Sequence, residues 1–131
     1  MTDLIKVFFT LDAGDWHGFV TESLWARPIA GTPDTLLLEL QNTPFYARNV
    51  SYLDVVRAVE ADGVSAYAGT VRESGHSTYR LIGEAGLALD SWWTKLDQLG
   101  CTRESGRTGH RLIYAVDIPP KADIHAAYAV L

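Results

Sequence analysis

The residues best suited to chemistry lie in a turn-like segment, residues 74–78, which reads Ser-Gly-His-Ser-Thr. An imidazole beside hydroxyl groups can act as a general base, so His76 is the first candidate for catalysis. Tyr46, Arg48 and Arg72 could join it as the acid and the anion clamp of a ribonuclease-like site. The alternative is structural, because a histidine in such a turn can hydrogen-bond the backbone and arginines can pair with acids across strands.

Other catalytic and cofactor chemistries lack the residues that they need. The serines beside His76 are its sequence neighbours, which rarely gives productive geometry, and no Gly-x-Ser-x-Gly elbow occurs. No glycine pattern matches a phosphate-binding or dinucleotide-binding loop. The histidines are spaced too widely for a metal motif; they are His17, His76, His110 and His125. The leading interpretation therefore has no catalytic residue, no metal site and no cofactor.

The charge of the chain is unevenly distributed. The formal net charge is −5, and residues 1–63 contain nine acidic and four basic side chains, whereas residues 64–131 contain seven of each. An acidic half opposes direct nucleic-acid binding, since phosphate contacts supply most of that affinity. It favours a basic protein partner by steering encounter, although modest acidity also simply keeps a cytoplasmic protein soluble.

Trp16 stands out because it follows an acidic turn, in what should be a loop. An exposed tryptophan is a plausible anchor for a protein partner, and the alternative is that its ring folds back over the core. With the acidic side chains it defines the predicted partner-binding set, which is Asp12, Asp15, Trp16, Glu22, Glu60 and Asp62.

Size and composition predict one domain in the cytoplasm. The chain has 131 residues, enough to bury a core without staples. Its single cysteine, Cys101, cannot form an internal disulfide and is expected to be a small buried residue after a helix. No apolar run is long enough to span a membrane, and Asp3 precedes the first apolar run, unlike a signal peptide.

The first part of the chain predicts a β-rich unit over residues 4–82. Short β-branched and aromatic runs separated by turn residues indicate strands at residues 5–11, 19–29, 35–40, 54–59, 64–72 and 78–82. They suggest a bent antiparallel sheet or a partial β-barrel. Residues 42–50 form an irregular connection, in which Phe45 and Tyr46 are expected to plug one end of the sheet or barrel.

The pattern changes after Gly86. Apolar residues at helical spacing predict an amphipathic helix over residues 89–99, followed by Gly100 at its end. A strand that starts at residues 101–104, a turn at 105–109, a strand at 110–118 and a helix at 121–131 follow. We therefore expect an α+β fold in which residues 83–131 continue the sheet as a ferredoxin-like β-α-β-β-α unit and share one core with the first part.

Several segments of the chain resemble a family of small bacterial proteins known only as a domain of unknown function. The resemblance rests on Trp25-Ala26, on residues 42–47 (Asn-Thr-Pro-Phe-Tyr-Ala) and 53–56 (Leu-Asp-Val-Val), on the Ser-Gly-His-Ser-Thr turn, and on residues 99–101 (Leu-Gly-Cys) and 116–120 (Val-Asp-Ile-Pro-Pro). It covers most of the chain and implies a shared fold but no reaction.

The sequence thus favours a non-catalytic protein-binding module. The most concrete form is an immunity protein that occludes a cognate bacterial toxin, such as a basic nuclease. Two alternatives remain open. One is a small hydrolase or nuclease centred on His76. The other is a regulatory domain that binds a small ligand in a barrel mouth lined by Phe45, Tyr46 and Tyr67.

Overall fold

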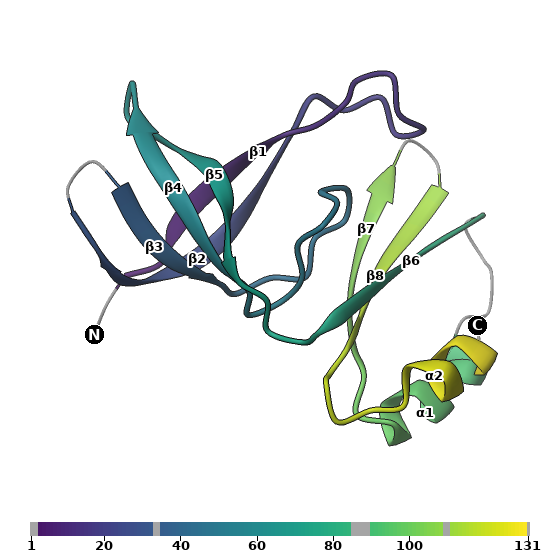
Figure 1. The fold of residues 1–131 in the computed structure, drawn as a ribbon. Helices are drawn as coiled ribbons and strands as arrows, with labels where there is room; N and C mark the ends of the chain where they lie inside the picture. Colours follow the sequence, from purple (N-terminus) through teal and green to yellow (C-terminus); the bar gives the residue numbers. More distant parts are fainter. Residues whose placement is uncertain (1–2, 33–34, 85–89, 109–110, 131) are drawn as a thin grey trace.

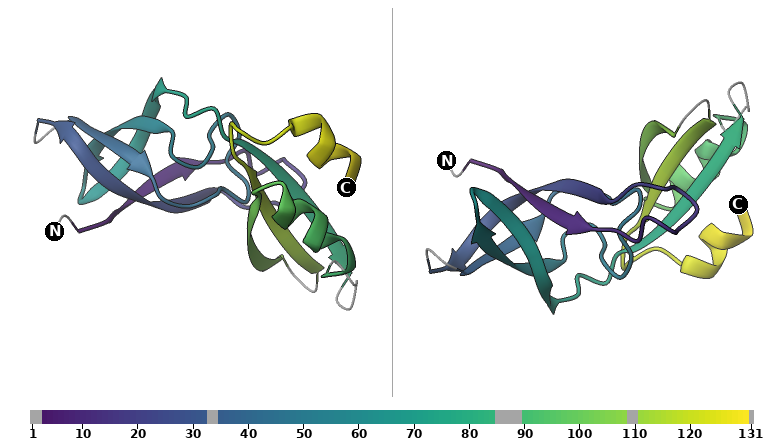
Figure 2. Two further views of the ribbon diagram at one scale, coloured as in Figure 1. Left: turned by 90° about the horizontal axis from the view of Figure 1, so that it is seen from below. Right: turned by 90° about the horizontal axis from the view of Figure 1, so that it is seen from above.

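The computed structural model describes residues 3–32, 35–84, 90–108 and 111–130. Along the chain it contains β1 (Ile5–Thr10), β2 (Thr21–Gly31), β3 (Thr35–Leu40), β4 (Val55–Ala61), β5 (Val64–Arg72), β6 (Ser77–Glu84), α1 (Asp90–Gln98), β7 (Thr102–Thr108), β8 (Arg111–Ile118) and α2 (Ile124–Val130) (Figure 1). The molecule is elongated, with the first five strands at one end and the last three strands and both helices at the other (Figure 2).

Strands β1 to β5 form a closed barrel. Consecutive strands pair antiparallel, and β1 and β5 close the barrel as a parallel pair. Alternate side chains point inward because the side-chain period of a strand is two, which places Val7 and Phe9 of β1 inside the barrel. The partial barrel predicted from the sequence is therefore closed, and the expected sixth strand lies outside it.

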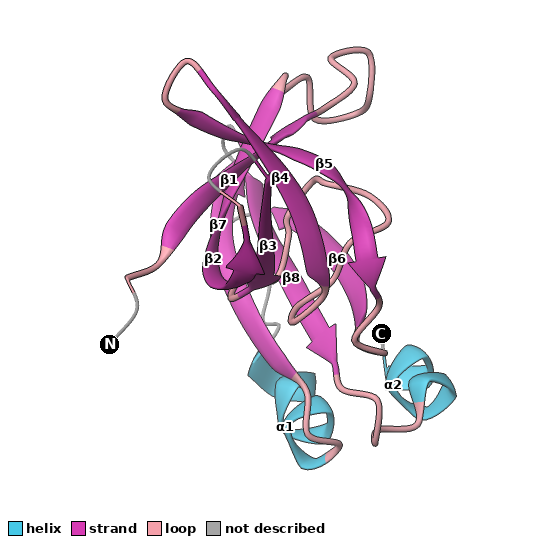
Figure 3. Ribbon diagram, turned by 60° about the vertical axis from the view of Figure 1, so that its left-hand side comes forward, coloured by secondary structure: helices cyan, strands magenta, loops and turns pink. Residues whose placement is uncertain are grey.

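Strand β6 belongs instead to a second sheet with the order β6-β8-β7. Both outer strands run antiparallel to β8, so β6 and β7 are parallel to each other with β8 between them. Helices α1 and α2 lie on one side of this sheet, α1 toward β7 and α2 toward β6 (Figure 3). The succession of strand, helix, hairpin and helix agrees with the expected order, and the ferredoxin-like assignment stays a prediction.

Most buried hydrophobic residues of the described chain form two clusters, while Val55, Ile113 and Ala115 are buried outside both. One fills the barrel around Leu38, and the other lies between the second sheet and the helices around Leu96. The single shared core that we expected is thus divided into two main clusters. The face of the second sheet turned toward the connection carries the buried Ile113 and Ala115, but most of its other side chains are polar, Glu104 and Asp117 among them. Cys101 is buried in the second cluster, as predicted.

Two boundaries differ from the sequence pattern for local reasons. Strand β7 continues through Ser105 and Gly106, which read as a turn, because these residues pair with Tyr114 and Ile113 of β8. Helix α2 starts later than expected because Asp123 caps it, its carboxylate accepting the backbone N–H groups of residues 125 and 126 at 2.9 and 3.2 Å.

Gly31 gives a direct test of the close approach between β2 and β3. It adopts φ 132°, and a Cβ built there would overlap the Thr35 carbonyl oxygen and lie 2.9 Å from Leu36 Cα. We expect Gly31→Ala to lower the free energy of unfolding by about 2–4 kcal/mol in urea titrations. Gly63→Ala is the control, since a Cβ there meets open space at φ 77° and only the backbone conformation costs about 1 kcal/mol. Equal losses at the two glycines would contradict the close approach at Gly31.

Candidate functional site

The connection between β3 and β4 lies between the barrel and the second sheet and contacts both. In β8, Val116 and Ile118 pack toward the helices, so Asp117 points to the other face of the sheet. The strand register places Thr78 and Thr102 beside Asp117 on that face. The polar face of the second sheet therefore meets the irregular connection, residues 41–54.

Charged side chains hold the backbone of this connection. The Glu22 carboxylate of β2 accepts the N–H groups of Phe45, Tyr46 and Ala47 at 2.7, 3.0 and 2.7 Å. From β6, the Arg80 guanidinium donates to the carbonyl oxygens of Phe45, at 2.7 Å, and of Ala47. Burial lowers the pKa of Arg80, and the nearby Glu22 charge works in the opposite direction. Two opposite charges from different strands thus fix the same three residues.

Two further carboxylates complete the attachment. Glu104 of β7 accepts the Thr43 N–H at 2.6 Å. Asp54, which is buried, accepts the N–H groups of Ser51 and Ser74 at 2.9 and 2.8 Å and so ties the connection to the turn before β6. A buried carboxylate that accepts backbone N–H groups stabilises an irregular segment in the way that a ladder stabilises a strand.

His76 forms a dyad with Asp117 across the β6–β8 pair. Its Nδ1 lies 3.0 and 2.8 Å from the two Asp117 carboxylate oxygens, and the Tyr52 ring meets the imidazole edge-on at 5.3 Å. Burial raises the pKa of Asp117, while the hydrogen bond and charge of His76 lower it. Because Nδ1 faces a carboxylate, it carries the proton, and the lone pair of a neutral imidazole is then on Nε2.

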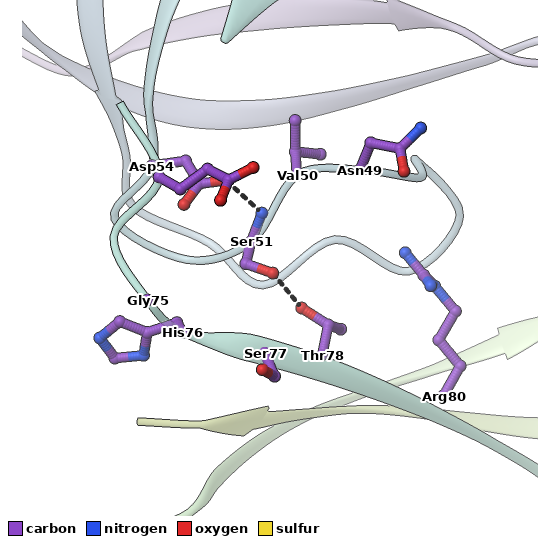
Figure 4. A pocket seen from close by; sticks show the side chains of 10 residues that line it. Asn49, Val50, Ser51, Asp54, Gly75, His76, Ser77, Thr78 and Arg80 are labelled. Carbon is purple, nitrogen blue, oxygen red and sulfur yellow. Dashed lines mark hydrogen bonds between the residues drawn. The ribbon is translucent and has the colours of Figure 1, made fainter. Parts of the chain in front are cut away.

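His76 lines two cavities. One of about 460 Å³ contains Ser51, Asp54, Thr78 and Arg80, and Figure 4 shows the imidazole at its side, pointing away from the Ser51 and Thr78 hydroxyls. The other cavity, of about 400 Å³, is lined by Thr43, Tyr52, Thr102, Glu104 and Asp117 among others. Residues from three segments that carry the family resemblance therefore meet here, since Thr43, His76 and Asp117 line the same cavity.

A second candidate region lies where the β1–β2 loop meets the connection. We call Trp16, Phe19, Val20 and Tyr46 the aromatic end of the barrel. The Tyr46 ring lies 5.7 Å from that of Trp16 and 5.0 Å from that of Phe19. Trp16 is 50% exposed, Phe19 42% and Val20 59%, so the sequence alternative in which the Trp16 ring folds back over the core is not realised.

A cavity of about 310 Å³ adjoins this patch. Its lining includes Asp12, Asp15, His17, Tyr46 and Arg48. Asp15 accepts a hydrogen bond from Arg48 at 2.6 Å, and the backbone N–H of Trp16 together with the Arg48 charge holds the pKa of Asp15 below its usual range. Asp12 is exposed and uses one carboxylate oxygen to accept the Gly14 N–H at 2.9 Å.

The predicted partner-binding residues divide into three groups. Asp12, Asp15 and Trp16 lie together at the aromatic end. Glu22 does not present its charge to a partner, because its carboxylate is used by the connection. Glu60 and Asp62 lie at the β4–β5 hairpin, at the opposite end of the barrel (Figure 1). The parallel β1–β5 pair explains this separation. It places the β4–β5 hairpin toward the start of β1, whereas the loop that contains Asp12 follows the end of β1. The six predicted residues therefore do not share one surface, and the binding role of those at the aromatic end stays a prediction.

The predicted ribonuclease-like set is not brought together. Tyr46 and Arg48 line the cavity at the aromatic end, while His76 lines the two cavities at the second sheet. Arg72 is exposed at the end of β5. Sequence reasoning missed Asp117 as the partner of His76, although a lone acid inside the apolar run of residues 112–118 was a usable signal of a buried carboxylate.

Of the aromatic residues expected to line a barrel mouth, Phe45 and Tyr46 stay in ring contact at 6.2 Å and Tyr67 lies elsewhere. Tyr67 stacks on Phe9 at 4.7 Å and hydrogen-bonds Thr70 at 2.7 Å, which places it against the barrel core. The Phe45 ring lies against Gly106 of β7, and Tyr46 belongs to the aromatic end. Of the three cavities described above, one is lined by Tyr46 and none by Phe45 or Tyr67. No helix among the described residues is long and apolar enough to cross a membrane.

Residues 22–131 match a protein-family model described as "Domain of unknown function (DUF4265)". No curated protein matches the chain. Among solved structures it is similar to a hypothetical protein from Neisseria gonorrhoeae, with a TM-score of 0.70 and 18% sequence identity over 98% of this chain and 84% of that chain. At this identity the likeness concerns the fold alone.

The role of Glu22 can be tested by removing its charge without changing its shape. Glu22→Gln leaves one neutral acceptor oxygen for three N–H groups and removes the anion that lies near the buried Arg80. We expect the free energy of unfolding to fall by about 2–4 kcal/mol in urea titrations. The matched control is Glu60→Gln at an exposed position, where we expect a change within about 0.5 kcal/mol. Similar stabilities for the two variants would show that Glu22 does not hold the connection.

Proposed function

The chain belongs to the DUF4265 family, whose function is unknown, and we propose from its own residues that it is a non-catalytic protein-binding module. The contact surface in this proposal is the aromatic end of the barrel. The observation that carries it is the exposure of Trp16, Phe19 and Val20 on one loop beside Tyr46. Exposed aromatic clusters are typical of interfaces, where tryptophan and tyrosine supply most of the binding energy.

The loop is held in place before any partner binds. Three side chains of the loop accept backbone N–H groups at 2.9 Å: Asp12 from Gly14, Asp15 from Trp16 and His17 from Phe19. A binding surface fixed in this way loses little conformational entropy on association, which favours affinity. The rings of Trp16 and Phe19 are thus presented by the loop rather than left mobile.

The chemistry beside the patch favours a basic partner. A lysine or arginine side chain could enter the adjoining cavity, where Asp12 has a carboxylate oxygen without a described hydrogen bond and Asp15 shares its charge with Arg48. The faces of Trp16 and Tyr46 would add cation–π attraction. The most concrete form of the proposal is a cytoplasmic immunity protein that covers the basic cleft of a cognate toxin, such as a nuclease.

The chain offers matched variants for testing this surface. We expect the double variant Trp16→Ala with Phe19→Ala to lose the partner that the unmodified tagged protein captures from its host, and Asp12→Lys to weaken capture at low salt. The control is Glu60→Lys with Asp62→Lys, which makes an equal or larger charge change at the far end of the barrel and should leave capture intact. Loss of capture in the control but not in the aromatic variant would contradict the proposed surface.

The immunity form has its own measurement. The captured protein, or its isolated toxic domain, should arrest growth when produced alone, and co-production of the unmodified chain should restore growth. The Trp16→Ala with Phe19→Ala variant should fail to restore it at equal abundance. A captured protein that leaves growth unaffected would exclude the immunity form while leaving the binding module standing.

A second candidate, a small hydrolase, is favoured by the Nδ1 contact between His76 and Asp117. The buried carboxylate fixes the tautomer, so Nε2 could take a proton from water while the water oxygen attacks an ester carbon or a phosphorus atom. The bond to the leaving oxygen then breaks, and Nε2 returns the proton to it. In this form Asp117 is a positioning residue that acts through His76.

The hydrolase candidate predicts changes in both the rate and the pH profile of hydrolysis. With p-nitrophenyl acetate and bis(p-nitrophenyl) phosphate as probes, His76→Ala should abolish p-nitrophenol release, while Asp117→Asn should lower it and shift the pH profile, because the asparagine no longer favours an imidazolium. His125→Ala, at an exposed position on α2, is the matched histidine control. If neither probe is hydrolysed above the rate of the His76→Ala variant, the pair is structural.

A further inference from the structure

The only sheet edges among the described strands belong to the second sheet, because the barrel is closed. In the order β6-β8-β7, β6 and β7 each pair with β8 on one side. An outer strand presents backbone N–H and C=O groups that can pair with another chain, so natural edges usually carry charges, bulges or prolines that prevent it.

The two edges differ in this protection. Strand β7 carries three charged residues within seven; Glu104 accepts the Thr43 N–H and the Arg103 guanidinium lies over the Trp93 ring, which leaves Arg107 to protect the edge. Strand β6 pairs with β8 over eight consecutive residues without a bulge, and it contains no proline. Its one basic residue, Arg80, is turned toward the connection and hydrogen-bonds two carbonyl oxygens there, so it does not guard the edge. The strand also carries Glu84 at its end, so by these criteria β6 is the less protected edge.

The side chains beside β6 also lack cover. Ile82 is 42% exposed on the strand itself. On the helix side, Tyr128 of α2 is 67% exposed and its ring lies 5.9 Å from that of Tyr79, while Ile124 is 37% exposed. Figure 3 shows α2 on the β6 side of the sheet, so these apolar groups flank the free edge.

We propose that a second copy of this chain adds its β6 to this edge, antiparallel, and makes one continuous six-stranded sheet. A twofold axis perpendicular to the sheet keeps both pairs of helices on the same side. This requires odd-numbered residues of one β6 to lie opposite odd-numbered residues of the other, and even-numbered opposite even-numbered. An axis at Arg80 would oppose two arginines. An axis at Leu81 instead opposes Leu81 to Leu81 and avoids this repulsion.

The register centred on Leu81 is self-complementary at the neighbouring positions. Tyr79 lies opposite Gly83 of the second copy, where an aromatic ring can cover a residue that has no side chain. Ile82 lies opposite Arg80 of the second copy, so its apolar surface meets the aliphatic part of a side chain whose charged end is already bound. The two α2 helices then approach each other at the axis, and Tyr128 of each copy loses its exposure.

The register gives a charge test with a matched pair of variants. The full chain should sediment as a dimer in analytical ultracentrifugation. Ile82→Lys opposes two cations across the interface and should shift the population to monomer, whereas Ile82→Glu at the same position opposes an anion to Arg80 and should keep the dimer. Val59→Lys, a lysine at an exposed position on the barrel, controls for added charge.

Cysteine cross-linking tests the register itself. Two copies of Leu81→Cys would face each other at the axis and form an intermolecular disulfide under mild oxidation, whereas Ile82→Cys places its sulfurs two residues apart and should cross-link poorly. Far-UV circular dichroism and urea midpoints like those of the unmodified chain confirm folding of each variant. A chain that sediments as a monomer, a dimer that survives Ile82→Lys, or equal cross-linking at both positions would overturn the proposal.

Discussion

The structure depends on one arrangement of opposite charges around the backbone of residues 45–47. Glu22 approaches residues 45–47 from the barrel and accepts all three N–H groups, and Arg80 approaches from the second sheet and donates to the carbonyl oxygens of Phe45 and Ala47. An irregular segment has no ladder to satisfy its backbone, and each buried peptide group without a partner costs free energy comparable to a lost hydrogen bond. The two charges remove that cost and also neutralise each other.

This constraint explains why polar groups lie between the two main apolar clusters, beside the buried Ile113 and Ala115. The second sheet covers one face with the two helices, and its other face must meet a segment whose main chain is exposed to it. Thr78, Glu104 and Asp117 on that face supply hydrogen-bonding groups, where leucine or valine would leave the peptide groups of the connection unpaired. The same reasoning gives the His76–Asp117 pair a structural role, since the imidazole is a partner for a carboxylate that burial would otherwise penalise.

The sequence predicted what local patterns determine and missed what tertiary contacts determine. Alternation and turn residues located the strands of the barrel, and the spacing of Leu96 with its neighbours located α1. Nothing local distinguishes Glu22, in the middle of a strand, from an exposed acid, because its three partners lie more than twenty residues away. The closing β1–β5 pair is equally nonlocal, and without it the loop at Asp12 and the hairpin at Asp62 could not be assigned to opposite ends.

The same constraint links the stability of the fold to the surface proposed for binding. Tyr46 contributes a ring to the aromatic end through its side chain, while its backbone N–H is held by Glu22. Its position relative to Trp16 and Phe19 is therefore set by a carboxylate that no partner would touch. A change at Glu22 would displace the Tyr46 ring. Weaker binding by such a variant would therefore reflect the altered position of Tyr46 and not the loss of a contact between Glu22 and the partner. Substitutions at Trp16 and Phe19 remove ring contacts to Tyr46 but leave the hydrogen bonds from Glu22 and Arg80 to the connection in place, which is why they separate binding from folding better than a change at Glu22.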